Sequence, residues 1–346
     1  MSSDLISIIM PVYNVEKYVG AAIHSVLNQS YKHFELIIVD DCSLDKSIDA
    51  INPFTDSRIR VIRLKKNQGV AFARNLAIAE SKGGYLAFLD SDDVMNQHRL
   101  KKQVAFMKRQ PEIALCGGRA RTISLENRIS RYIDKMVIDP KAVNSTLVFG
   151  NIFCTSTIMM RREAMPTGGF RQRYAEDYDF LVRVAEKHQL GIASDIFADY
   201  RIRPGSAMHT YAIENKKRDV WESQAPLFDA LKISPTAQEK EIHLFTRTNA
   251  GNVDREQLLA IYDWYMRLIE ANRQAKVYPE NAFKLAASYM WFSHLFRATG
   301  CGSAALGMFF GRSLSLAHPQ PVSRMAKFVV KATIRRKLVR GGKITA

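Results

Sequence analysis

The chain has 346 residues, of which 47% are hydrophobic, and its formal net charge is +16 at pH 7. This length and composition predict a chain that folds as one large domain or two around a sizeable core. The charge is uneven, because eleven basic residues and no acidic residue follow Glu280, which leaves residues 1–280 with a net charge of only +5. The basicity therefore belongs to a C-terminal tail, and not to the body of the protein.

Targeting and redox signals are absent from the sequence. The four cysteines are widely separated and show neither metal-site nor redox spacing, which is typical of small core residues in a reducing cytoplasm. The N-terminus lacks the basic start and apolar run of a secretion signal. The most apolar late stretches fall short of the roughly 18 to 20 clean residues of a membrane span. We expect a cytoplasmic protein whose membrane contact, if any, is peripheral.

The first two thirds of the chain predict alternating strands and helices. Predicted strands cover residues 5–11, 34–39, 59–64, 85–89, 113–116, 155–160 and 192–200, and predicted helices cover residues 16–29, 45–51, 70–81 and 97–109. Short strands that alternate with helices of about 10 to 15 residues predict an α/β sandwich with a mostly parallel sheet. Residues 119–150 give no clear pattern.

Carboxylates directly follow two of the predicted strands. Asp40 and Asp41 end the second strand, and the run Asp90–Asp93 ends the fourth. Ligands of open α/β sheets lie beyond the carboxyl ends of the strands, so these acids can act on one ligand. If the chain stays extended, Asp90 and Asp92 point the same way and can hold a hard cation, Mg²⁺ or Mn²⁺, through oxygen. The alternative is that the acids are turn formers, with Asp90 as a helix cap.

A third group of acids lies on a predicted helix near residue 176. Glu176, Asp179 and Arg183 would share one face of this helix, whereas Asp177 would share a face with Leu181. Asp177 is then the acid turned most toward the apolar side, where burial raises the pKa of a carboxyl, as a general base near neutral pH requires. The alternative is an ordinary amphipathic helix with a charged rim.

The C-terminal part has a different character. Beyond about residue 212 the pattern predicts a string of helices, with prolines such as Pro226 as breakers. Residues 322–340 place most of their basic side chains on one helical side, which favours a helix on an anionic bilayer, at about 1 kcal/mol per basic residue. A solvated or disordered tail is the alternative. We expect a catalytic domain over residues 1–212, a helical region over 213–320 and a basic tail over 321–346.

Five motifs, in this order, closely resemble the family-2 glycosyltransferases of bacterial polysaccharide assembly. The motifs are ISIIMPVYN at residues 6–14, VDDCS at 39–43, NQG at 67–69 leading to ARN at 73–75, LDSDD at 89–93, and GF at 169–170 followed by EDYD at 176–179. The resemblance covers roughly residues 5–210. It implies a GT-A fold, which is a Rossmann-like mixed sheet with helices on both faces, followed here by a C-terminal helical region. It also implies a nucleotide-sugar donor, a divalent metal and inversion at the anomeric carbon.

The resemblance also implies roles for individual residues. Those implied to bind the donor are Pro11, Tyr13 and Asn14 around the nucleotide, Asp40 or Asp41 on the base, Asp90 on the ribose, and Asp92 through a metal on the diphosphate. Asp177 would be the general base, supported by Glu176. Arg74, Arg201 and Arg203 are the cationic residues that could help to hold the diphosphate, although relatives often have a histidine at the place of Arg203.

The partners implied by the resemblance are a UDP-, GDP- or dTDP-sugar donor and a glycan or lipid-linked acceptor, with the basic tail on the inner membrane leaflet. A sugar-nucleotide nucleotidyltransferase is the competing enzyme class, but such enzymes begin with a Gly-rich phosphate loop, where this chain has Pro11-Val12-Tyr13-Asn14. A signalling receiver domain would place its acid pair after the first strand, whereas here a full strand and helix precede it. A basic nucleic-acid-binding protein would need a recognisable module beside the tail, so we expect no nucleic-acid partner.

Overall fold

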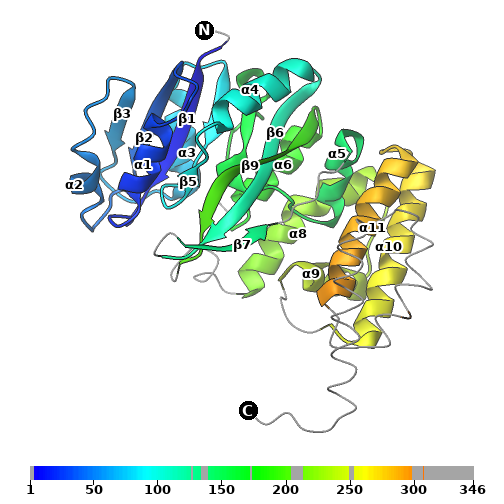
Figure 1. Ribbon diagram of the computed structural model, residues 1–346. Helices are drawn as coiled ribbons and strands as arrows, with labels where there is room; N and C mark the ends of the chain where they lie inside the picture. Colours follow the sequence, from blue (N-terminus) through cyan, green and yellow to red (C-terminus); the bar gives the residue numbers. More distant parts are fainter. Residues whose placement is uncertain are drawn as a thin grey trace. The chain divides into compact units, whose positions relative to one another are not determined.

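The computed structural model describes residues 4–125, 128–133, 139–171, 174–203, 213–248, 253–297 and 307, and the chain divides into two compact units (Figure 1). The first unit comprises residues 1–140 and 152–215, and the second comprises residues 141–151 and 216–346. The predicted basic tail, residues 321–346, lies outside the described residues.

One half of the sheet in the first unit is parallel. Its strands, in spatial order, are β3 (Ile59–Arg63), β2 (Phe34–Asp40), β1 (Ile6–Val12) and β4 (Tyr85–Phe88). The connecting helices are α1 (Val19–Leu27), α2 (Ser47–Ile51) and α3 (Val70–Ala79). Every residue of β1 and of β4 is buried, because helices pack over a parallel sheet and apolar side chains then suit both faces.

The other half of the sheet is mixed. Its strands are β8 (Met159–Arg161), β6 (Ile113–Ile123), β9 (Gln189–Arg201) and β5 (Val94–Met95), with β7 (Ile129–Ile133) paired to β6. β6 and β9 are parallel, whereas β8 is antiparallel to both of its neighbours and β5 is antiparallel to β9. The helices of this half are α4 (Arg99–Arg109) and α6 (Glu176–Ala185), and short 3-10 helices η1 (Thr155–Thr157) and η2 (Arg162–Ala164) flank β8.

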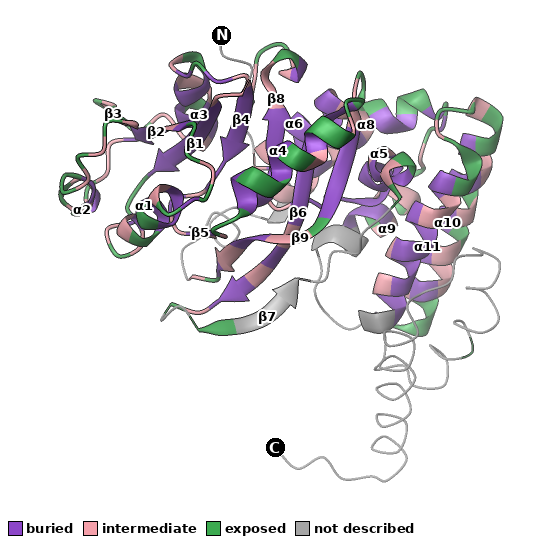
Figure 2. Cartoon of the chain, turned by 45° about the horizontal axis from the view of Figure 1, so that its top comes forward, coloured by how far each residue is buried: buried purple, intermediate pink, exposed green. Residues whose placement is uncertain are grey.

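The predicted α/β class and the mixed sheet of the GT-A fold are confirmed, and the sheet has nine strands among the described residues. The mostly parallel pattern expected from the apolar runs holds only for the half that contains β1 to β4. The strand predicted over residues 155–160 is partly wrong, because residues 155–157 form η1 and only the end of the segment enters β8. Figure 2 shows β1, β4 and β6 buried along most of their length, while the outward side of α4 is exposed.

The parallel strands bring the predicted site residues to one end of the sheet. In the registers of β1 with its two neighbours, Val12 lies opposite Asp40 and Ile9 lies opposite Phe88. The chain segments that follow β1, β2 and β4 therefore leave the sheet at the same end, as the sequence predicted.

The second unit is helical. Its elements are α5 (Pro140–Phe149), α8 (Ile213–Ala230), α9 (Ala237–Thr248), α10 (Arg255–Ala275) and α11 (Glu280–Arg297). Trp264, Tyr265 and Trp291 are buried in it, whereas Trp221 is only partly buried. Pro226 lies inside α8, so the expectation that this proline breaks a helix is wrong.

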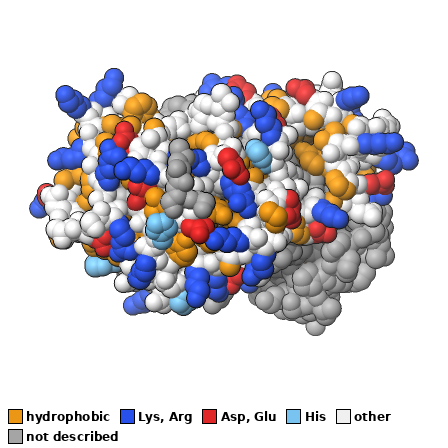
Figure 3. Space-filling model, turned by 90° about the horizontal axis from the view of Figure 1, so that it is seen from above, with side chains coloured by type: hydrophobic (Ala, Val, Ile, Leu, Met, Phe, Trp, Pro, Cys, Tyr) orange, Lys and Arg blue, Asp and Glu red, His pale blue; other side chains and the backbone are white. Residues whose placement is uncertain are grey.

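The described helices include none that is both apolar enough and long enough to cross a bilayer. On the face of the molecule drawn in Figure 3, Lys and Arg side chains are interspersed with Asp and Glu.

Candidate active site

The turn after β1 carries the first predicted site residues. Pro11 is buried in β1, whereas Tyr13 is 41% exposed. Asn14 adopts a left-handed φ of 51°. Its Oδ1 accepts a hydrogen bond from Leu44 N at 2.8 Å, and its backbone N donates to Ser43 Oγ at 3.1 Å. These bonds tie the turn after β1 to the loop after β2 and leave the Tyr13 ring exposed, where it can stack against a flat ring such as a nucleotide base.

The acid pair after β2 is occupied by backbone groups. Asp41 Oδ1 accepts from Gln68 N, and Asp41 Oδ2 accepts from Gly69 N, each at 2.7 Å. Gly69 is the N-cap residue that directly precedes α3, so Asp41 stabilises the positive end of that helix. Asp40 is also buried, and its Oδ1 accepts from Ser43 N at 3.3 Å. Both carboxylates therefore organise the loops around the site.

The chain does not stay extended after β4. It turns at Ser91 and Asp92, and Asp93 N donates to Asp90 O at 3.1 Å. The expectation that Asp90 and Asp92 project the same way from an extended strand is therefore wrong, because this short Asp- and Ser-rich segment closes a turn. The two acids still interact. Burial, and after it the negative charge of Asp90, raise the pKa of Asp92, whereas Arg203 acts to lower it.

Arg74 of α3 joins two acids from different elements. Its Nη2 contacts Asp90 Oδ1 at 2.7 Å, and its Nη1 contacts Glu176 Oε1 at 2.8 Å. The Arg74 side chain is only 4% exposed, and its guanidinium lies 5.2 Å from the centre of the Phe170 ring. Burial opposes the charge, but Asp90 and Glu176 outweigh it and raise the pKa of Arg74. Arg74 therefore stays charged and holds both carboxylates.

Asp93 is fully buried and is held by groups of the protein. Its Oδ2 accepts from Ser156 Oγ at 2.5 Å, and its Oδ1 accepts from the backbone N of Arg201 at 2.8 Å. Burial and then the charges of Asp92 and Asp90 raise the pKa of Asp93 well above its usual range. The Arg201 side chain is buried as well and donates from Nε to Asp92 O at 2.8 Å. These contacts fix the turn after β4 against η1 and the end of β9.

Arg203 follows β9 and reaches the remaining acid of this turn. Its Nε donates to Asp92 Oδ2 at 2.5 Å, and the two side chains are 23% and 17% exposed. The position that departs from the resembled family therefore lies directly against the predicted metal ligand.

The sequence analysis did not identify Arg99, whose side chain binds backbone carbonyls of β4 and of the segment around η1 at this end of the sheet. Arg99 is fully buried, and its guanidinium donates to the carbonyls of Ser156, Ile158 and Phe88 at 2.6, 2.8 and 3.1 Å. Its Nε also donates to Gln103 Oε1 at 2.8 Å. Burial lowers the pKa of Arg99 to about 10. An arginine and a glutamine four residues apart on the apolar side of a predicted helix were the available signal.

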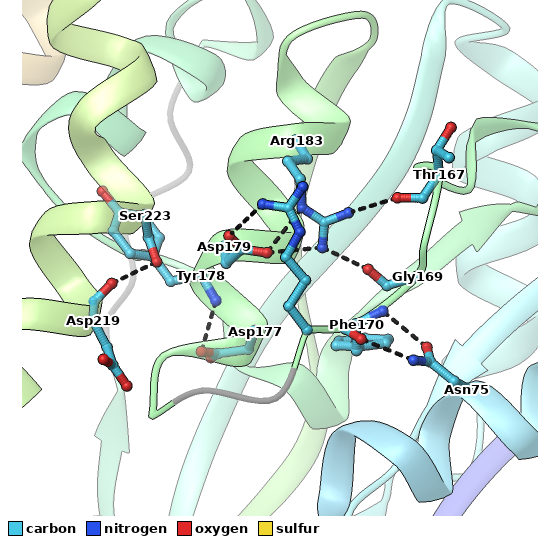
Figure 4. Close-up of polar contacts among 11 residues, drawn as sticks. Asn75, Thr167, Gly169, Phe170, Asp177, Tyr178, Asp179, Arg183, Asp219 and Ser223 are labelled. Atoms are coloured by element: carbon cyan, nitrogen blue, oxygen red, sulfur yellow. Dashed lines mark hydrogen bonds and ion pairs between the residues drawn. The ribbon is translucent and has the colours of Figure 1, made fainter. Parts of the chain in front are cut away.

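The acids of α6 are arranged differently from the prediction, as Figure 4 shows for two of them. Asp179 is the most buried, at 3% exposure, and its Oδ2 accepts from Arg183 Nε at 2.8 Å. Asp177 is only partly buried, and its Oδ1 accepts from Tyr178 N at 2.7 Å. The expectation that Asp177 is the acid turned most toward the apolar side is therefore wrong. Burial raises the pKa of Glu176 to about 7, although Arg74 acts to lower it.

The loop before α6 is fixed by the residue next to Arg74. Asn75 Oδ1 accepts from Phe170 N, and Asn75 Nδ2 donates to Phe170 O, both at 2.8 Å (Figure 4). Gly169 adopts a φ of +59°, and a Cβ there would lie 2.3 Å from Asn75 Oδ1. Phe170 stacks on Phe180 of α6 with ring centres 4.1 Å apart. Consecutive residues of α3 thus position both this loop and Glu176.

The acids fit a cation that is shared with a bound substrate. Among the described residues, no group of three or more His, Cys, Asp or Glu side chains is arranged to hold a metal ion alone. Mg²⁺ and Mn²⁺ prefer oxygen ligands, and Mg²⁺ is commonly held by one or two carboxylates together with substrate phosphates. Asp92, which is partly exposed beside Asp90, offers a carboxylate of this kind.

The fold and the site together define a protein of the α/β class with acids gathered where parallel strands end, which is where such folds bind their ligands. The profile of glycosyl transferase family 2 matches residues 7–168. An uncharacterized glycosyltransferase of Haemophilus influenzae is 41% identical over 186 residues, which are 53% of this chain and 72% of that protein. The chain belongs to glycosyl transferase family 2 and is a glycosyltransferase.

A further relative and a solved structure agree with this assignment. The UDP-Glc:alpha-D-GlcNAc-diphosphoundecaprenol beta-1,3-glucosyltransferase WfgD of Escherichia coli is 30% identical over 208 residues, covering 60% of this chain and 80% of that protein. The crystal structure of Staphylococcus aureus TarS 1-349 in complex with UDP-GlcNAc matches with a TM-score of 0.54 and 19% identity, over 98% of this chain and 93% of that one. The latter similarity shows the GT-A fold.

Proposed function

We propose that this glycosyltransferase moves a sugar from a nucleotide-sugar to a hydroxyl group of a lipid-linked glycan, with inversion at the anomeric carbon and with the help of a divalent cation. The observation that carries the proposal is the bridge made by Arg74. It holds Asp90, on the side of the predicted donor, and Glu176, which precedes the predicted base Asp177. Donor and acceptor groups thereby belong to one connected site.

On the donor side, the Tyr13 ring stacks on the base and Asn14 keeps the adjoining turn in place. Asp40 or Asp41 contributes to recognition of the base, and Asp90 binds the ribose. Asp41 uses both carboxylate oxygens to hold the two residues that directly precede α3, so its contribution is the shape of the pocket.

At the diphosphate, Asp92 would hold the divalent cation. When bound, such a cation neutralises negative charge on the departing nucleoside diphosphate. Both terminal amino groups of Arg74 contact carboxylates, so we assign Arg74 a positioning role, and Arg203 is the arginine whose side chain remains partly exposed beside Asp92.

On the acceptor side, Asp177 takes the proton from the attacking hydroxyl group. Its carboxylate is partly exposed at the start of α6. The attacking oxygen forms the new bond to the anomeric carbon while the bond to the diphosphate oxygen breaks, and the proton passes to Asp177 Oδ. Glu176 and Arg74 keep the start of α6 in register with Asp90.

A lipid-linked acceptor is supported by the Escherichia coli relative, whose name specifies a diphosphoundecaprenol acceptor. Together with the eleven basic residues after Glu280, this favours work on the cytoplasmic face of the inner membrane. The membrane part is tested by vesicle flotation of the full chain and of a chain that ends at Pro319. Equal binding of both chains to anionic vesicles would contradict it.

The function is tested with a panel of UDP-, GDP- and dTDP-sugars and Mg²⁺ or Mn²⁺, by following release of nucleoside diphosphate. We expect one donor class to be hydrolysed or transferred only with metal, and Asp92→Ala and Asp177→Asn to lower the rate by about 100-fold or more. Arg60→Gln, which removes a surface ion pair with Glu80, serves as the control and should keep full activity. Metal-independent release, or activity retained in both site variants, would refute the proposal.

A further inference from the structure

Three arginines contact the turn after β4, and they are held to very different degrees. Arg74 is 4% exposed and contacts two carboxylates. Arg201 is 3% exposed and donates from its side chain to the carbonyls of Asp92, Ser124 and Leu125. Arg203 is 23% exposed, and its contact with Asp92 is its only hydrogen bond to the described part of the chain. Arg203 is therefore the arginine that can leave.

The Arg203–Asp92 contact uses only one donor of the guanidinium and one oxygen of the carboxylate. It runs from Nε to a single carboxylate oxygen, Oδ2, at 2.5 Å. Neither terminal amino group of Arg203 makes a hydrogen bond to the residues that the structure describes. A guanidinium presents its donors in a fork that suits phosphate oxygens. At the same time Oδ2 of Asp92 is occupied, so a cation that needs this oxygen has to displace Arg203.

The charges decide when that displacement is favourable. With Arg203 in place, the charge of Asp92 is balanced. A lone divalent cation would add two positive charges beside a guanidinium in a partly buried site, where repulsion between like charges is strong. A cation that arrives with a diphosphate brings negative charge for the released guanidinium. The exchange is then neutral, and every charged group has a partner.

We propose that Arg203 holds Asp92 in the donor-free enzyme and yields it to the divalent cation only when the cation comes with the nucleoside diphosphate, which the released guanidinium then binds. Arg203 thus acts as an internal stand-in for the cation and makes metal binding depend on the donor. This inference rests on the proposed metal-dependent function.

The test measures binding of Mn²⁺ to the full chain by electron paramagnetic resonance of the free ion, with and without UDP, GDP or dTDP. For Arg203→Gln we expect Mn²⁺ without nucleotide to bind about tenfold more tightly than to wild type, because the competing charge is gone. With saturating Mn²⁺, the nucleotide that wild type prefers should bind about tenfold more weakly, because a charged hydrogen bond to the diphosphate is lost. Arg203→Lys, which keeps the charge, should bind Mn²⁺ alone as wild type does, and Arg60→Gln is the matched surface control.

The opposite signs of the two effects separate this role from a structural one. If Arg203→Gln weakens both metal and nucleotide binding, or leaves Mn²⁺ binding without nucleotide unchanged while wild type binds Mn²⁺ with nucleotide, the inference is wrong and the proposed function stands. If neither wild type nor any variant binds Mn²⁺ with any of the three nucleotides, the proposed metal dependence is wrong, and this inference falls with it.

Discussion

At the end of β2, Asp41 accepts hydrogen bonds from two backbone amides, whereas at the end of β4 Asp90 and Asp92 each contact an arginine guanidinium. Backbone amides at the start of a helix are fixed parts of the fold, so the first carboxylate cannot change partners without disturbing α3. The Arg74 guanidinium beside Asp90 is buried and fixed as well, whereas the Arg203 guanidinium beside Asp92 is partly exposed on a long side chain, and a metal ion or another positive group can replace it. Similar acids at the ends of parallel strands therefore have different roles: Asp41 fixes the shape of a loop, whereas Asp92 can exchange one positively charged partner for another.

The largest effect on stability should come from removing the guanidinium of Arg74, which is the buried partner of Asp90. Arg74→Met leaves Asp90 and Glu176 without their common partner in a buried setting, so we expect the free energy of unfolding to fall by about 3–5 kcal/mol. Urea denaturation monitored by circular dichroism measures this. The surface variant Arg60→Gln should change the same quantity by less than about 1 kcal/mol. A similar small change in both variants would show that Arg74 is not the anchor described above.

The second effect concerns pH and the far partner of Arg74. Burial raises the pKa of Glu176 to about 7 in the folded protein, whereas an unfolded glutamate titrates near pH 4.3. Between these values the folded state keeps a proton that the unfolded state has lost, so stability falls as the pH rises through this window. At about 1.4 kcal/mol per pKa unit, the whole fall amounts to about 4 kcal/mol, of which about 3 kcal/mol lies between about pH 5 and about pH 8.

Unfolding of wild type and Glu176→Gln at about pH 5 and about pH 8 tests this assignment. We expect the loss of stability on going to the higher pH to be smaller in Glu176→Gln by about 3 kcal/mol, because glutamine does not titrate. An identical pH dependence in the two proteins would mean that another group is responsible.

A third, smaller effect concerns the loop before α6, which Asn75 holds next to Gly169. The substitution that tests it changes no carboxylate. Gly169→Ala introduces a side chain at a φ of +59° and within 2.3 Å of Asn75 Oδ1. The left-handed conformation costs about 1–2 kcal/mol for a residue with a Cβ, and Asn75 must shift from its two bonds to Phe170. We expect a loss of about 2 kcal/mol in thermal or urea unfolding. In the matched variant Gly20→Ala the new Cβ meets no atom within 4 Å, and stability should not fall. A neutral Gly169→Ala variant would contradict the tight approach.

The smallest effects sharpen the comparison directly. In wild type both Asp41 oxygens accept hydrogen bonds from backbone N–H groups. Asparagine has only one acceptor oxygen, so in Asp41→Asn one of these N–H groups loses its partner. The free energy of unfolding should therefore fall by about 1–2 kcal/mol. Asp92→Asn removes only an ion pair that is partly exposed, so stability should change by less than about 1 kcal/mol, while Mn²⁺ binding in the presence of nucleotide is lost. If Asp92→Asn proves the more destabilising of the two, the distinction between fixed and exchangeable acids fails.

Much of the first unit follows from the sequence alone. Apolar runs predicted β1, β2 and β4, and alternation predicted β3. The sequence also predicted α1, α3 and α4, and the order of five motifs predicted the family. Such signals are local, because a period of two or of 3.6 residues reports which side of its own element a residue occupies. They also placed the acids at the correct end of the sheet, since parallel strands must end together.

The tertiary structure decided which group each acid contacts. Arg74 and Glu176 lie 102 residues apart in the chain, and Arg203 and Asp92 lie 111 residues apart. Helical spacing selected Asp177 as the buried acid of α6, but contacts with Arg171 and Arg183 bury Asp179 instead. The periodicity of a segment contains no information about such partners, because they come from other segments that packing brings alongside it. The sequence by itself thus determined where the acids lie along the strands and helices. Their partners, and with them their protonation, depend on long-range packing.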